Sequence, residues 1–156
     1  MKLMNVQILI LRLALAGLFL HLGMDKFHEG WLQNPEHLKE SLSAFQQKAT
    51  GYQLTYMEKV AIPYAGLWSR LIVIGECALG VSLLIGMLVR FSSAVGILMV
   101  LNFHAATGNL FTLNFFGSPS AALLVAGLLV TFLSRAGRWV GIDTLLAKTN
   151  PRGMLW

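Results

Sequence analysis

Four long apolar runs constrain this sequence more than any other feature. They cover about residues 3–23, 67–89, 91–111 and 118–133. A helix rises 1.5 Å per residue, so roughly 17–25 apolar residues are needed to cross about 30 Å of hydrocarbon. Strands that span a membrane would instead show alternating stretches of about ten residues, and the sequence has none. The runs therefore predict an all-α integral membrane fold, a bundle of four transmembrane helices in which the fourth is the shortest.

The composition agrees with a membrane protein and excludes several other classes. Of the 156 residues, 56% are hydrophobic and 12% are charged, and a soluble domain this small could not bury so much apolar surface. The low charge excludes a disordered chain and a coiled coil, and Cys77 alone cannot form an internal disulfide. The net charge of +5 does not indicate nucleic-acid binding, because the basic residues are scattered singly. We expect one membrane domain over residues 1–156.

The connection between the first two spans, residues 24–64, is long enough to hold structure of its own. The letters NPE at residues 34–36 are typical of a helix start, with an acidic residue in the first turn. Leu38, Leu42 and Phe45 then follow at i, i+4 and i+7. This spacing predicts an amphipathic helix, which either lies on the membrane surface or packs on the mouth of the bundle.

The distribution of positive charges predicts the orientation. The long connection carries four lysines, offset by five carboxylates and spread over many residues. Positive residues concentrate on the cytoplasmic side of membrane proteins. We therefore expect both termini in the cytoplasm and the long connection outside. The cytoplasmic side then collects six basic residues: Lys2, Arg90, Arg135, Arg138, Lys148 and Arg152.

Two charged residues, Arg12 and Glu76, fall inside the first and second runs. A charge within the bilayer costs several kcal/mol, so it normally faces a partner or a cavity. Counting along the helices from their cytoplasmic ends places Arg12 roughly 13 Å deep and Glu76 roughly 20 Å deep. An arginine side chain can bridge that gap, so we predict an Arg12–Glu76 ion pair. The pair fixes how two spans pack, or forms a polar site for proton or quinone chemistry, and the two roles are compatible.

Asn102 and His104 add polar groups to the third run. His104 counts to the same depth as Glu76, roughly 20 Å, whereas His21 lies some 7 Å from that level. Two axial ligands of one haem should face each other at similar depth, so we expect no haem. No metal-binding spacing of His and Cys occurs in the sequence, so we expect no metal site either.

Three segments together resemble a known family. They are LRLALAGLFLHLGMDKF in the first span, GECALGVSLLIGMLVRFSSAVG from the second span into the third, and AGRWVGIDTLL after the fourth. On these segments the sequence resembles the DoxX/DoxD family of small four-helix membrane proteins, and within it the DoxD-type subunit of thiosulfate:quinone oxidoreductase. The matching positions are Arg12, Lys26, the Gly75-Glu76 pair and the terminal Gly141-Ile142-Asp143.

The resemblance implies a bacterial or archaeal inner-membrane protein linked to quinone-dependent oxidation. The reaction would join two thiosulfates to tetrathionate and pass the electrons to a membrane quinone, together with a DoxA-like subunit. A quinone needs an apolar slot and one or two hydrogen-bonding or proton-accepting groups. Arg12, Glu76 and His104 are the candidate catalytic residues, and Asn102 is a further candidate contact for the quinone.

Two other classes of function stay open. The chain could be a non-catalytic subunit of a larger respiratory or photosynthetic complex, binding its neighbours through the glycines and the uncharged fourth span. A transporter is disfavoured, because four spans without an inverted repeat are few. The expected partners are membrane lipid, membrane quinone and other subunits of a membrane complex.

Overall fold

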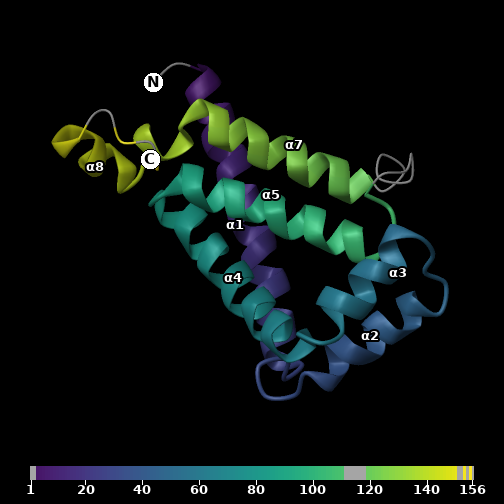
Figure 1. Ribbon diagram of the computed structural model, residues 1–156. Helices are drawn as coiled ribbons and strands as arrows, with labels where there is room; N and C mark the ends of the chain where they lie inside the picture. Colours follow the sequence, from purple (N-terminus) through teal and green to yellow (C-terminus); the bar gives the residue numbers. More distant parts are fainter. Residues whose placement is uncertain (1–2, 111–118, 151–152, 154, 156) are drawn as a thin grey trace.

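A computed structural model describes residues 3–110, 119–150, 153 and 155, and these residues form helices and turns without any strand (Figure 1). The predicted all-α fold is confirmed. The elements in chain order are α1 (Leu3–His28), α2 (Glu36–Gln46), α3 (Tyr52–Tyr56), a π-helix (Met57–Ala61), α4 (Ala65–Ile85), α5 (Val89–Ala106), α7 (Pro119–Ser134), a 3-10 helix (Ala136–Arg138) and α8 (Asp143–Thr149).

Three helices are long and apolar enough to cross a membrane. They are α1 with 26 residues, α4 with 21 and α5 with 18. The protein is therefore a multi-pass membrane protein, and three of the four predicted spans are confirmed by length and composition. The fourth predicted run, residues 118–133, coincides with α7, an apolar helix of 16 residues. Residue 118, the first of that run, lies outside the described part of the chain.

The helices α1 and α4 run antiparallel and pack closely because glycines line the contact. A Cβ placed on Gly23 would lie 2.6 Å from Cys77 Sγ, and one placed on Gly80 would lie 2.6 Å from Leu20 Cγ. Small residues let two backbones approach in this way inside a membrane. Gly23 thus faces Cys77 and Leu20 faces Gly80, and these two contacts define the register of the pair.

Replacing Gly80 with Ala should destabilise the bundle by about 1–3 kcal/mol, because overpacking a close contact forces a backbone shift. The added methyl group would lie 2.8 Å from the backbone nitrogen of Leu20, which cannot turn away. Gly17→Ala in α1 is the matched control, since a Cβ there meets no atom within 4 Å. SDS-induced unfolding in mixed micelles measures the free energy of unfolding of both variants. Equal stability of the two variants would contradict the assigned register.

The long connection folds against one end of the bundle, where α2, α3 and the π-helix lie beside the start of α4 and the end of α5 (Figure 1). The predicted amphipathic helix is present as α2, and the side chain of Asn34 accepts the N–H of Glu36 at its start. Leu38 and Leu42 are buried in a cluster that includes Met57. Of the two alternatives for this helix, the structure therefore shows packing on the bundle.

Candidate functional site

The predicted ion pair between Arg12 and Glu76 is wrong, and the register of α1 and α4 explains why. The guanidinium of Arg12 lies beside Gly86, where its Nη1 would be 2.9 Å from an added Cβ. Glu76 precedes Gly86 by ten residues, which is about 15 Å along the helix. The first residues of α1 therefore extend beyond the end of α4. A depth counted from the start of α1 and a depth counted from the end of α4 therefore have different origins. Comparing them places Arg12 and Glu76 too close together.

Glu76 instead forms an ion pair with Lys26, in the last turn of α1. Lys26 Nζ lies 2.8 Å from one carboxylate oxygen and 3.0 Å from the other. The same ammonium group donates to the carbonyl of Leu22 and lies 5.9 Å from the ring centre of Trp31. The two side chains are mostly buried, with 21% of Lys26 and 11% of Glu76 exposed.

This pair places a proton acceptor and a hydrogen-bond donor between two membrane-spanning helices. Glu76 is the twelfth of the 21 residues of α4, so its carboxylate is near the middle of that span. An ionisable pair inside the membrane is an indication of a functional site, because its burial is costly. Removing one charge would leave the other buried without compensation. The pair can therefore hold the helices together and also exchange protons or bind a polar ligand.

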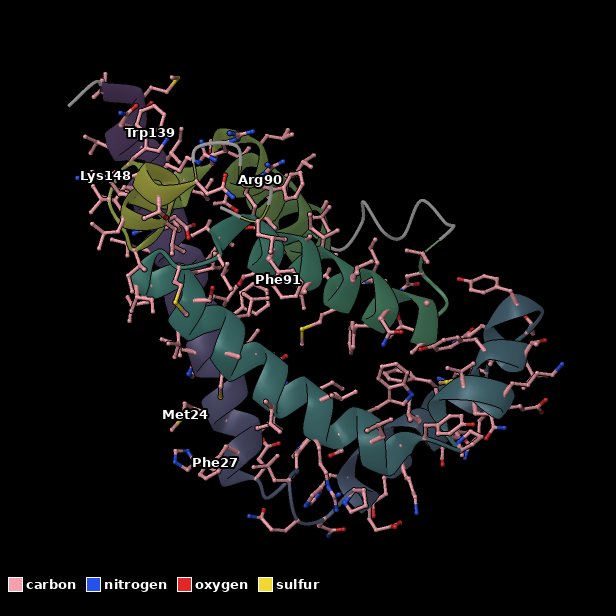
Figure 2. All side chains as sticks on the ribbon, turned by 60° about the vertical axis from the view of Figure 1, so that its left-hand side comes forward. Met24, Phe27, Arg90, Phe91, Trp139 and Lys148 are labelled. Carbon is pink, nitrogen blue, oxygen red and sulfur yellow. The ribbon has the colours of Figure 1, made fainter. Side chains whose placement is uncertain are left out.

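An apolar groove of about 770 Å³ runs along the α1–α4 contact. Its walls include Met24 and Phe27 of α1, which point away from the bundle in Figure 2. Cys77, next to Glu76 in the sequence, also lines the groove. A Cβ on Gly23 would lie close to both Cys77 and the Cβ of Glu76. The groove and the ion pair are thus adjacent: Gly23 contacts Cys77, which lines the groove, and Glu76, which forms the ion pair.

Arg12 serves the fold at the opposite end of the bundle. Its side chain is 2% exposed, and Nη1 donates to the carbonyls of Ala136 and Val140 at 3.0 and 2.6 Å. The carboxylate of Asp143 is near enough to stabilise the positive charge. Arg12 therefore joins α1 to the segment that follows α7. Nη1 of Arg12 is thus used on two protein carbonyls, which gives the residue a structural role at this end of the bundle.

Asp143 completes the same cluster by capping α5. Its carboxylate is fully buried and accepts the backbone N–H of Leu88 at 2.6 Å and that of Val89 at 3.0 Å. These donors are the first groups of α5, which lack intrahelical partners. In return, the backbone N–H of Asp143 donates to the carbonyl of Gly86. The chain after α7 is thus fastened to the turn between α4 and α5.

The other two candidates, Asn102 and His104, lie near the C-terminal end of α5. Asn102 Oδ1 accepts the hydroxyl of Tyr56 at 2.6 Å, which ties α3 to α5. Burial raises the pKa of the Tyr56 phenol, and the hydrogen bond to Asn102 acts in the opposite direction. Asn102 thus links α5 to α3 in this structure.

His104 is buried in the last turn of α5, but it does not share the level of Glu76. In the α4–α5 pair, Gly75 faces Met99, so the level of Glu76 falls near residue 98. His104 is six residues further, about 9 Å along the helix. Within the described residues, no group of three His, Cys, Asp or Glu side chains is placed to hold a metal ion.

The DoxX family matches residues 7–107 of the sequence, about two thirds of the chain. The chain belongs to the DoxX family. The match covers α1 from residue 7 onwards, α4 and α5, and with them both members of the Lys26–Glu76 pair; it ends before Asp143. The comparisons with curated proteins and with solved structures give no match.

In this DoxX protein, the apolar runs of the sequence do not by themselves reveal the partner of Glu76. The first apolar run ends at about Gly23, which places Lys26 in the connection. The helix continues to His28, and Lys26 follows the buried Phe19 and Gly23 by seven and three residues. That spacing places Lys26 on the buried face of α1. The spacing, together with the family motif that contains Lys26, was the available signal.

Proposed function

We propose that this DoxX protein is the membrane subunit of a quinone-linked oxidoreductase, with the Lys26–Glu76 pair as the polar part of its quinone site. The observation that carries the proposal is the buried ion pair between two membrane spans, adjacent to an apolar groove. Quinones combine a polar ring with an apolar tail. A site for them needs a few polar groups within an apolar wall.

The chemistry of the pair fits a quinone. Reduction of a quinone to a quinol consumes two electrons and two protons. The Glu76 carboxylate can hold and release a proton at membrane depth, and the Lys26 ammonium can donate a hydrogen bond to a carbonyl oxygen. Of the four residues expected at the site, we retain Glu76. Arg12 is left out because it lies beside Gly86, about 15 Å along α4 from Glu76, and its Nη1 donates to backbone carbonyls.

The resemblance to DoxD-type subunits supports thiosulfate as the electron donor. Two thiosulfate ions lose two electrons in total and join through a new S–S bond to give tetrathionate. Those two electrons, with two protons, convert one quinone to one quinol. A partner subunit of the DoxA type receives the donor. In this proposal α7 is the fourth span, the protein lies in the inner membrane of a bacterium or archaeon, and both termini are cytoplasmic.

The quinone content of the purified protein tests this proposal. We expect quinone in the organic extract of the native chain and its co-isolated subunits, and clearly less in Glu76→Gln. Glu36→Gln is the matched control, since Glu36 also pairs with a lysine at 2.8 Å but is exposed on α2. An extract without quinone from any complex that contains the chain would favour a non-catalytic subunit of a respiratory or photosynthetic complex.

A further inference from the structure

The segment after α7 has one face fixed to the bundle and one face exposed. Its fixed face is the buried carboxylate of Asp143 with its two bonds to the start of α5. The backbone N–H of Ile142 also donates to the carbonyl of Ile85. Because α4 and α5 are both membrane-spanning helices, the turn between them marks a membrane boundary. The segment is therefore held at that boundary.

The exposed face of this segment is apolar. Ile142 and Leu145 are 38% and 61% exposed and lie three residues apart, at the start of α8. Lys148 follows after three more residues, so the three side chains share one face of the helix. Trp139 is exposed just before them, and its indole N–H is held by the carbonyl of Ser134. Tryptophan is enriched where a protein meets the boundary between lipid and water.

The charge on this face is positive and not balanced by nearby exposed acids. Arg135 and Lys148 are exposed on either side of the apolar residues. Of the seven Asp and Glu residues of the chain, six lie between residues 25 and 76, and the seventh, Asp143, is buried. Figure 2 shows Trp139 and Lys148 at the end of the molecule opposite Met24 and Phe27.

We propose that residues 135–148 form a binding surface for anionic phospholipid headgroups. The side chains of Trp139, Ile142 and Leu145 insert among the upper parts of the acyl chains. Arg135 and Lys148 bind the phosphate and the negative headgroup. The buried bonds of Asp143 keep this face turned towards the lipid. The surface does not involve the Lys26–Glu76 pair, so its test is independent of the proposed quinone site.

Native mass spectrometry of the full chain, released from mild detergent and titrated with phosphatidylglycerol or phosphatidylcholine, tests this surface. We expect tighter binding of phosphatidylglycerol, and a loss of about fivefold per basic residue removed. The double variant Arg135→Gln/Lys148→Gln should therefore bind phosphatidylglycerol roughly 25-fold more weakly. Lys48→Gln/Lys59→Gln removes the same charge from exposed positions in the outer connection, and should bind as the native chain does.

Leu145→Asn keeps every charge and should also weaken lipid binding, because it removes the most exposed apolar side chain of α8. Excess inorganic phosphate should leave the bound lipid in place, whereas displacement by phosphate would show a simple anion site and overturn the proposal. Equal affinity for the two lipids, or an equal loss in the Lys48→Gln/Lys59→Gln control, would overturn it as well.

Discussion

Replacing Glu76 with Gln is expected to lower thiosulfate-dependent quinone reduction by the isolated complex roughly 10²–10⁴-fold. The amide keeps the shape of the side chain but cannot accept a proton at neutral pH. Lys26 would still lie within reach and could still donate a hydrogen bond. The loss should therefore appear mainly in kcat, with a smaller change in KM. A stopped-flow assay with a soluble quinone analogue measures both constants.

The double variant Lys26→Gln/Glu76→Gln separates this loss from misfolding. A single substitution leaves one buried charge without its partner, which destabilises the helix pair. The double variant removes both charges, so it should be more stable than Glu76→Gln while staying inactive. Glu36→Gln should keep native activity. Full activity of a well-folded double variant would show that the Lys26–Glu76 pair is not part of the quinone site.

Asp143→Ala is expected to reduce stability by about 3–5 kcal/mol, the largest effect on folding that we predict for a single residue. The substitution leaves the N–H groups of Leu88 and Val89 without their acceptor and removes the negative charge near Arg12. Leu88 also has a positive φ of 53°, which is costly for a residue other than glycine. The carboxylate therefore helps to hold a strained turn as well as the start of α5.

Thermal unfolding in detergent, followed by circular dichroism, measures this loss. Asp143→Asn is the useful comparison, because its amide oxygen can still accept one of the two bonds but carries no charge. We expect its stability to lie between those of the native chain and Asp143→Ala. If Asp143→Ala unfolds at the native temperature, the cap is not what fastens the C-terminal segment to the bundle.

The helices could be predicted from the sequence because each span is encoded locally, by a continuous apolar run. The same holds for α2, whose start at NPE and whose spacing of Leu38 and Leu42 are properties of a few adjacent residues. Helix register is different. It depends on which residues of α1 and α4 face each other at the close contacts of Gly23 and Gly80. No single run of residues specifies this pairing.

The candidate site was only partly predictable for the same reason. Glu76 could be selected because a carboxylate inside an apolar run needs an explanation. Its partner could not be derived by counting depth, since α1 extends beyond α4 at one end. The role of Asp143 depends on contacts with Leu88 and Val89, which precede it in the chain by 55 and 54 positions. Within the sequence, only the family resemblance indicates that aspartate.

Photoaffinity labelling with an azidoquinone tests the central claim most directly, namely that a quinone binds at the Lys26–Glu76 pair. The native complex would be illuminated with the probe, digested and analysed by mass spectrometry. We predict labelled peptides from the last turns of α1, residues 22–28, and from the middle of α4, residues 73–80. Excess unlabelled quinone should suppress the labelling, and Glu76→Gln should reduce it. Labelling confined to α5, α7 or a partner subunit would contradict a quinone site at this pair.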